Sequence, residues 1–144
     1  MMFKAKQYAR LRDQQFSLYE QYARQHGMNY KGLLILLWLY NNPAGISQKT
    51  LCDRTYSTKQ VVYAIIQNYI QKGYAKLKNS VSDKRRKLVV LTEEGRAYAA
   101  EIVAPLDAME EKAMAQLTKE QIEALFAATV CFTKYLGELM EERK

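Results

Sequence analysis

Residue types that build metal and redox sites are scarce in this chain of 144 residues. His26 is the only histidine, and the two cysteines, Cys52 and Cys131, lie far apart without CxxC spacing. These counts argue against a histidine-rich metal site, a disulfide framework and a zinc finger. We therefore expect no metal and no cofactor, interpret both cysteines as packing residues, and take a reduced cytoplasm as the simplest setting.

Long apolar runs and catalytic constellations are also missing from the sequence. The most apolar run, Gly32 to Tyr40, is much shorter than the roughly 20 residues that span a bilayer. The segment Met1 to Arg12 is charged and has no continuous apolar stretch, so we expect neither a signal peptide nor a membrane partner. With one histidine, no phosphate-binding glycine loop and no metal cluster, the sequence predicts that the protein is not an enzyme.

Positive charge is concentrated in the middle of the chain. Residues 46–96 hold 11 basic and 4 acidic side chains, a net charge of +7. Residues 97–144 hold 5 basic and 9 acidic side chains, a net charge of −4. A localised basic block is typical of a polyanion partner such as nucleic acid, although charge alone fits a soluble basic surface equally well.

Hydrophobic periodicity and capping residues divide the chain into helices and one hairpin. Asn29, Ser47, Thr92 and Thr118 are candidate N-caps, and either Ser57 or Thr58 caps the helix before Lys72, with Ser57 and Gln60 at capping-box spacing. Pro105 should kink or divide a long helix. The predicted fold class is mainly α with a small β-hairpin. The expected helices are 3–26, 30–40, 47–54, 58–72, a long helix from 92 and 118–142, and the expected strands are 74–78 and 87–91.

Two short helices joined by a tight turn and followed by a hairpin form the order of a winged helix-turn-helix. The start of the second helix is polar and can enter a major groove, where each base pair presents distinct donors and acceptors. The hairpin can reach the DNA backbone or the neighbouring minor groove, and its tip carries four consecutive cations. The candidate DNA-binding residues are Ser47, Ser57, Thr58, Lys59, Gln60, Tyr63, Gln67, Asp83, Lys84, Arg85, Arg86 and Lys87.

The hairpin motif resembles the wing of the MarR family of transcription regulators. In that motif an Asp, one residue and an Arg precede an apolar strand, which is followed by Leu-Thr, two residues and Gly. Here it reads from Asp83 and Arg85 through Leu91-Thr92 to Gly95. The segment Ile46 to Leu51 resembles the first helix of the family's helix pair, and Lys59 to Val62 with Lys72 to Tyr74 resembles the recognition helix and its exit. Leu77, Ser80-Val81 and Ala64 depart from residues common in the family, so base preferences are not carried over.

The resemblance implies a single MarR-type domain over residues 1–144 that acts as a homodimer. A DNA-binding lobe, 30–96, would lie between dimerisation helices in 1–27 and 97–144. The expected function is a sequence-specific regulator that binds a pseudo-palindromic operator as a repressor and is released by a small-molecule effector. The terminal helices carry more apolar side chains than one small lobe can bury, which also favours a partner surface.

Small aromatic or phenolic effectors are implied by the family, and a cleft bordered by aromatic side chains could hold one. Its candidates are Tyr19, Tyr22, Tyr30 and Trp38, although tyrosines at this spacing also suit a dimer-interface core. Two alternatives remain open: a regulator that needs no effector, and a winged-helix interaction module that has lost DNA binding.

Overall fold

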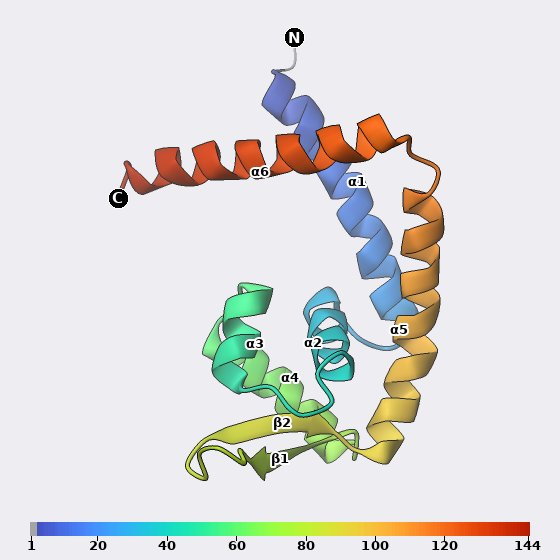
Figure 1. The fold of residues 1–144 in the computed structure, drawn as a ribbon, viewed down its shortest axis with the longest axis vertical. Helices are drawn as coiled ribbons and strands as arrows, with labels where there is room; N and C mark the ends of the chain where they lie inside the picture. The colour runs from blue at the N-terminus through green and yellow to red at the C-terminus, as the bar shows by residue number, and fades with distance from the viewer. Residues whose placement is uncertain (1–2) are drawn as a thin grey trace. The chain divides into compact units, whose positions relative to one another are not determined.

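The computed structural model describes residues 3–144, so residues 1 and 2 of the predicted dimerisation segment 1–27 lie outside the described residues. The described residues form six helices and one antiparallel hairpin, which confirms the predicted fold class (Figure 1). They divide into two compact units, the first ending at Ala104 and the second running Pro105–Lys144. The elements are α1 Lys4–Gln25, α2 Tyr30–Tyr40, α3 Gln48–Thr55, α4 Lys59–Gln71, β1 Ala75–Asn79, β2 Lys87–Leu91, α5 Glu93–Met114 and α6 Lys119–Glu141.

Helix α2 is the centre of the first unit and contacts α1, α3, α4 and β2. Its start is fixed by Asn29, whose side chain accepts a hydrogen bond from the backbone N–H of Gly32 at 2.8 Å. This satisfies one of the N–H groups that a helix start leaves without an intrahelical partner. Leucine and isoleucine side chains spaced around α2 are fully buried, which explains its almost continuous apolar sequence: Leu33, Ile35, Leu36 and Leu39.

Helices α3 and α4 begin at hydroxyl caps. Ser47 caps α3 by accepting from the N–H of Thr50 at 3.1 Å, as predicted. Thr58 caps α4 by accepting from the N–H of Val61 at 3.3 Å, so the predicted pairing of Ser57 with Gln60 is wrong. The Ser57 hydroxyl instead donates to the backbone carbonyl of Thr55 at 3.1 Å. That bond ties down the turn between the two helices and leaves the capping position to Thr58.

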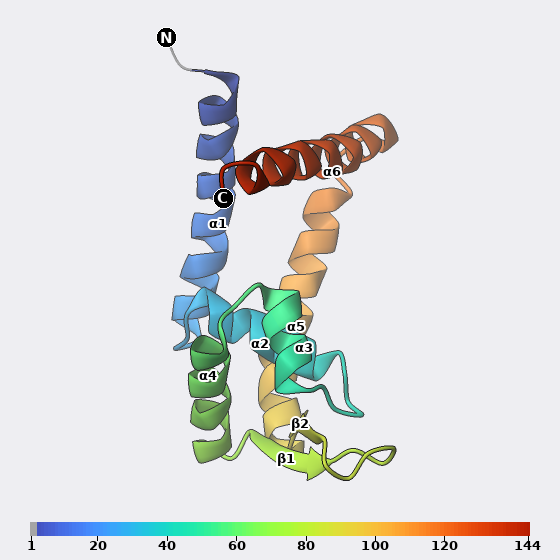
Figure 2. The same ribbon diagram turned by 90° about the vertical axis from the view of Figure 1, so that its left-hand side faces the viewer.

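The hairpin pairs Ala75 with Leu91 at one end and Asn79 with Lys87 at the other. Val89 of β2 also exchanges two backbone hydrogen bonds with Ile46, at 3.1 and 2.8 Å, so the segment before α3 is joined to the wing. Val89 is fully buried, whereas the turn residues 81–87 are exposed. The root of the hairpin is therefore fixed to the helices while its tip faces solvent (Figure 2).

The Leu-Thr-x-x-Gly motif fixes the junction between the hairpin and α5. The Thr92 hydroxyl donates to the carbonyl of Gly73 at 2.6 Å and accepts from the N–H of Gly95 at 3.0 Å. A Cβ atom at position 95 would overlap the backbone carbonyl of Tyr74, so only glycine fits there. The motif thus positions the end of α4 and the start of α5 against each other.

Helix α5 runs through Pro105 as one element, so this proline does not divide the helix, and the alternative of a kink stays a prediction. Proline removes one intrahelical hydrogen bond. Burial of Ile102 and Val103, which are 2% and 0% exposed, stabilises the helix just before it. The boundary between the two compact units nevertheless falls at this proline.

Helix α6 begins with the predicted capping box. Thr118 accepts from the N–H of Gln121 at 3.1 Å, and the Gln121 side chain accepts from the N–H of Thr118 at 2.8 Å. No residue of α6 is buried, and Cys131 is exposed, so the expected packing of this cysteine is absent from the single chain. Large apolar side chains are exposed along the helix: Leu125, Phe126, Val130, Phe132, Tyr135, Leu139 and Met140.

Within residues 3–144, no helix combines the length and apolar character that a membrane span requires. The same residues contain no group of three or more His, Cys, Asp or Glu side chains that could hold a metal ion.

Candidate nucleic-acid interface

The first half of α4 presents a polar face to solvent. Lys59, Gln60 and Tyr63 are exposed, and Gln67 is half-buried one turn further along. On the opposite side of the helix, Val62, Ile66 and Tyr69 are buried in the core. Residues three or four apart share one side of a helix, so the core packing of α4 turns its polar residues outward together.

A hollow of about 420 Å³ lies between the starts of α3 and α4. Gln48, Lys49 and half-buried Cys52 line it from α3. Lys59, Gln60 and Tyr63 line it from α4. Gln48 and Lys49 are not among the DNA-binding residues predicted from the sequence. Their position directly after the Ser47 cap is the sequence signal for their place on this surface.

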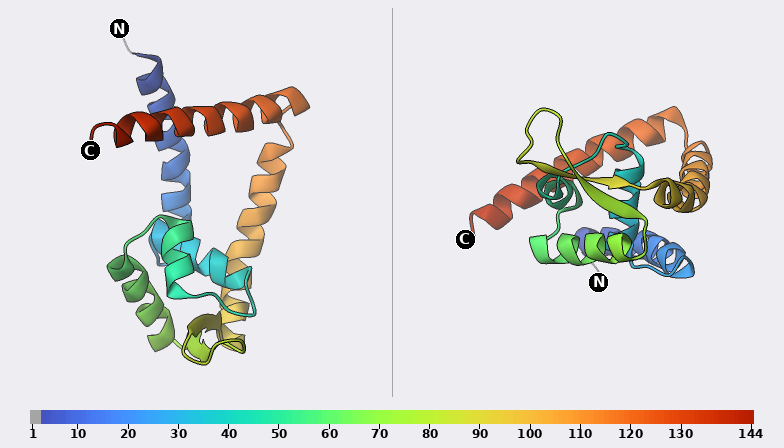
Figure 3. Two further views of the ribbon diagram at one scale, coloured as in Figure 1. Left: turned by 60° about the vertical axis from the view of Figure 1, so that its left-hand side comes forward. Right: turned by 90° about the horizontal axis from the view of Figure 1, so that it is seen from below.

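The wing turn is closed around Asp83. Its carboxylate accepts from the backbone N–H of Arg85 at 3.0 Å, and its backbone carbonyl accepts from the N–H of Arg86 at 3.0 Å. The Arg85 side chain is 97% exposed, with Nε 3.8 Å from the Asp83 carboxylate. Asp83 therefore orders the turn mainly through the backbone, and the Arg85 guanidinium extends into solvent. Figure 3 shows the turn between β1 and β2 from two further sides.

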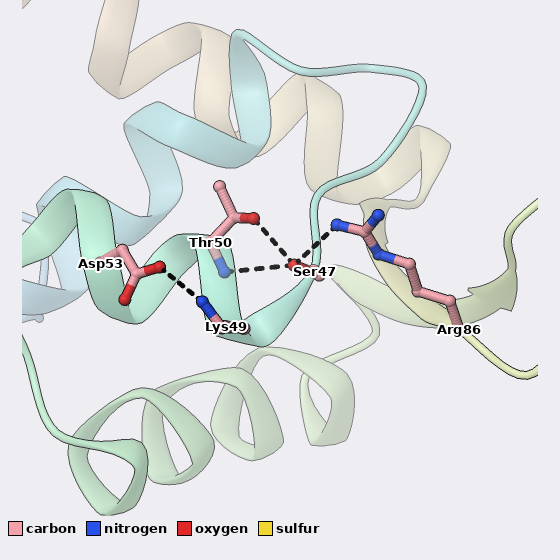
Figure 4. Close-up of polar contacts among 5 residues, drawn as sticks. All are labelled: Ser47, Lys49, Thr50, Asp53 and Arg86. Atoms are coloured by element: carbon pink, nitrogen blue, oxygen red, sulfur yellow. Dashed lines mark hydrogen bonds and ion pairs between the residues drawn. The ribbon is translucent and has the colours of Figure 1, made fainter.

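Arg86 points back toward α3, unlike Arg85. Its guanidinium donates to Ser47 Oγ at 3.3 Å, while Ser47 also bonds to the Thr50 hydroxyl at 2.9 Å (Figure 4). Ser47 is only 8% exposed. Ser47 and Arg86 thus join the wing to the start of α3. The ion pair between Lys49 and Asp53, at 3.1 Å, lies on the exposed side of α3.

The remaining wing cations also differ in their surroundings. Lys87 donates across the hairpin to the side chain of Asn79 at 2.6 Å. Lys84 is exposed at the tip. On β1, Lys76 and Lys78 are exposed and add to the positive charge of the wing. Of the four cations, Arg86 and Lys87 hydrogen-bond to other side chains of the protein, Arg85 lies 3.8 Å from the Asp83 carboxylate, and Lys84 is exposed.

The four effector candidates, Tyr19, Tyr22, Tyr30 and Trp38, lie in different surroundings. The rings of Tyr19 and Tyr30 are 5.9 Å apart, edge to face. The Tyr22 hydroxyl donates to the carbonyl of Ile102 at 2.5 Å, and burial raises the Tyr22 pKa. The Trp38 ring lies 4.9 Å from the guanidinium carbon of Arg54.

A cavity of about 460 Å³ does exist in the first unit, but none of those four residues lines it. Its wall includes Tyr69, whose hydroxyl donates to the carbonyl of Gly32 at 2.7 Å and so links α4 to α2. Burial, and to a smaller extent the charge of Tyr98, raises the Tyr69 pKa. Arg24, Lys72 and Tyr98 also line this cavity.

Comparison with known proteins shows a similarity to one family over part of the chain. Residues 26–86 match the family model of the MarR family. A search of curated proteins finds no match.

Solved structures share the fold over most of the chain. A MarR family regulator from Neisseria meningitidis has a TM-score of 0.84 at 22% identity and covers 99% of this chain and 100% of its own. S. aureus MepR in complex with DNA has a TM-score of 0.73 at 21% identity, covering 96% and 99%. CouR from Rhodococcus jostii, bound to p-coumaroyl-CoA, has a TM-score of 0.72 at 16% identity, covering 84% and 85%.

Proposed function

We propose that this chain is a transcription regulator of the MarR family that binds duplex DNA sequence-specifically in the cytoplasm. The observation that carries the proposal is the outward polar face of α4 beside a hairpin whose tip holds Lys84 and Arg85. A helix of this size fits the major groove, and an extended cationic ribbon can follow the backbone or enter the minor groove. The S. aureus MepR complex with DNA supports this role.

Each element has a different task in the proposed complex. Gln60 can bond an adenine edge through two atoms, Lys59 can reach guanine, and Tyr63 can contact bases or sugars. Lys84 meets phosphates, which position the protein without reading sequence, and Arg85 lies in or along the minor groove. The N-terminus of α4, which Thr58 caps, adds a partial positive charge suited to a phosphate.

We further propose that the active form is a homodimer on a pseudo-palindromic operator. Exposed apolar side chains of α6, such as Phe126 and Val130, and of α1, such as Leu11 and Phe16, support a dimer interface because they remain in water in the single chain. Two recognition helices would then address half-sites about one helical turn, roughly 34 Å, apart. Repression relieved by a small molecule is the mode we propose, supported by the p-coumaroyl-CoA bound to CouR.

Selection of bound fragments from random duplex DNA tests the proposal directly. We expect one enriched pseudo-palindromic motif. Gln60→Ala should weaken binding to it by roughly 1–3 kcal/mol and relax the preference at one position in each half-site. Gln71→Ala, at an exposed position in the last turn of the same helix, is the matched control and should bind normally.

The outcomes separate the alternatives. Failure to enrich any sequence, with no salt-dependent binding to duplex DNA, would contradict the proposal and favour a winged-helix interaction module. An equal loss on every sequence for Gln60→Ala would show that Gln60 contacts the backbone.

A further inference from the structure

The hollow of about 420 Å³ between α3 and α4 opens on the proposed DNA-reading face. Gln60 and Tyr63 line it from α4, and both are exposed to solvent. Gln48 and Cys52, about one helical turn apart, line it from α3. The hollow is therefore continuous with the face that carries the proposed base contacts, and a duplex seated on Gln60 and Tyr63 also covers the hollow.

Half-buried Cys52 gives the hollow an apolar wall. A thiol behaves as a small apolar group with only weak hydrogen-bonding capacity, and the ring of Tyr63, which is 56% exposed, adds further apolar surface. Lys49 and Lys59 line the hollow as exposed side chains, so their alkyl stems cover apolar surface while their ammonium groups stay in water. The hollow thus combines an apolar wall with two cations, of which Lys49 also pairs with Asp53 at 3.1 Å.

The groups that duplex DNA presents differ in how well they match this wall. Phosphates and the donors and acceptors of the bases are polar, and a thiol and a tyrosine ring would leave them without hydrogen-bond partners. The 5-methyl group of thymine is the apolar group on the major-groove edge of a base pair. In an A·T pair it shares that edge with the N6 and N7 atoms of adenine, which Gln60 is proposed to bond. The hollow that Gln60 borders therefore lies beside the place of a thymine methyl group.

We propose that the hollow receives the 5-methyl group of one thymine in each half-site, which makes Cys52 and Tyr63 specificity-determining residues. The thiol and the ring contact the methyl group, and the two lysines hold the neighbouring phosphates. Thymine is then selected by apolar contact, whereas Gln60 selects adenine by hydrogen bonds. This inference rests on the proposed function and adds to it the chemical group that is read between α3 and α4.

Replacing single thymines by deoxyuridine tests the proposal, because uracil pairs as thymine does and lacks only the methyl group. The probe is the duplex motif enriched from random DNA, and the full chain is titrated against it by fluorescence anisotropy. We expect one thymine in each half-site at which deoxyuridine weakens binding about fourfold, the factor for burying one methyl-sized group. Substitution in both half-sites should weaken binding about fifteenfold, since distant sites act additively.

5-Bromodeoxyuridine is the matched control for the deoxyuridine scan. Bromine is apolar and similar in size to a methyl group, so it should fill the hollow and restore the affinity at the sensitive position. A sensitive position that bromine does not restore would contradict an apolar seat for the methyl group.

Variants at Cys52 place the methyl group in the hollow. Cys52→Leu fills the hollow, so the preference for thymine over uracil at the sensitive position should disappear. Cys52→Ser keeps the size, but its hydroxyl binds water that the methyl group must displace, so the preference should fall below about twofold. Cys131→Ser, the same substitution at an exposed position of α6, is the matched control and should keep the wild-type preference. The preference is a ratio of two affinities of one protein, so a general loss of binding does not imitate the result.

Tyr63→Ala should also lower the preference, because it removes the ring from the wall, and it provides a second variant if those at Cys52 do not fold. Two results would overturn the proposal: no thymine that responds to deoxyuridine, or a responsive thymine whose preference is unchanged in every folded variant of Cys52 and Tyr63. A protein that binds no duplex at all would contradict the proposed function itself. Binding without a methyl-sensitive thymine would overturn this inference alone, so the two failures are distinguishable.

Discussion

The guanidinium of Arg86 donates to Ser47 Oγ over 3.3 Å, which joins the wing tip to the cap of α3. The same oxygen accepts from the N–H of Thr50 at 3.1 Å. One hydroxyl thus fixes both the start of α3 and the direction of the wing (Figure 4). An arginine in a run of four cations therefore acts as a positioning residue.

Replacing Arg86 and Lys84 separately should distinguish positioning from phosphate contact. Lys84→Ala should reduce the magnitude of the slope of log affinity against log salt concentration by about 0.9, the value for one lost phosphate contact. Arg86→Ala should lower the affinity with little change in that slope, because its guanidinium bonds to the protein. Gel-shift titrations over a range of salt concentrations measure both. Equal slope changes in the two variants would show that Arg86 also meets a phosphate.

Local sequence signals predicted most of the elements. Apolar spacing and single cap residues such as Asn29 and Thr118 act over a few residues, so the sequence contains the whole interaction. The cap of α4 was ambiguous because Ser57 and Thr58 are adjacent hydroxyls, and the bond from Ser57 to Thr55 decides between them. Continuity of α5 through Pro105 depends on tertiary packing, which the local rule for proline omits.

The candidate interface was predictable in composition but not in its contacts. Polar residues at the start of α4 followed from periodicity. The bond between Arg86 and Ser47 joins residues far apart in sequence, and no local pattern indicates it. The cavity beside Lys72 likewise forms only when α1, α2, α4 and α5 meet.

The hydrogen bond and the ion pair that join Asp83 to Arg85 can be separated by substitution. Asp83→Asn keeps an oxygen that can accept from the Arg85 N–H but removes the charge 3.8 Å from its guanidinium. Asp83→Ala removes both. We expect Asp83→Ala to weaken DNA binding, although it removes a negative charge, and Asp83→Asn to retain most of the affinity, because the turn is ordered through the backbone.

Gel-shift affinities of the two Asp83 variants should be compared with that of Arg85→Ala, which should lose roughly 1–3 kcal/mol in each half-site. Circular dichroism checks that each variant is folded. Tighter DNA binding by Asp83→Ala would show that Asp83 does not order the wing, whose cations would then act only as a basic patch.

A charge introduced on the apolar surface of α6 should separate the proposed dimer. Phe126 is 56% exposed in the single chain, so Phe126→Glu should leave the protomer folded. In a dimer the new carboxylate would be buried without a partner, which costs several kcal/mol, and the dimer dissociation constant should rise at least about a hundredfold. Sedimentation equilibrium measures it. Lys134→Glu, at an exposed polar position of the same helix, is the control, and equal behaviour of both variants would argue against this interface.

Alkaline pH should destabilise the fold through Tyr69. Burial raises its pKa above the ordinary value of 10.0, so above pH 10 the tyrosine ionises in the unfolded chain but stays protonated in the folded one. The unfolded state then binds fewer protons, and the free energy of unfolding falls as pH rises. Tyr22 and Tyr98 have pKa values raised in the same direction. Below pH 10 these tyrosines are neutral in both states and contribute no pH dependence.

Tyr69→Phe should remove one part of this pH dependence. Its free energy of unfolding near pH 7 should be lower than that of the wild type by about 1 kcal/mol, because the hydrogen bond to the Gly32 carbonyl is lost. Above pH 10 its slope should be shallower by about 1.4 kcal/mol for each pH unit, the effect of one group that titrates only in the unfolded chain. Urea unfolding followed by circular dichroism at several pH values measures both quantities. If the free energy of unfolding depends on pH in the same way for the wild type and the variant, the Tyr69 hydroxyl ionises equally in the folded and unfolded chains. Its hydrogen bond to the Gly32 carbonyl would then be lost at alkaline pH.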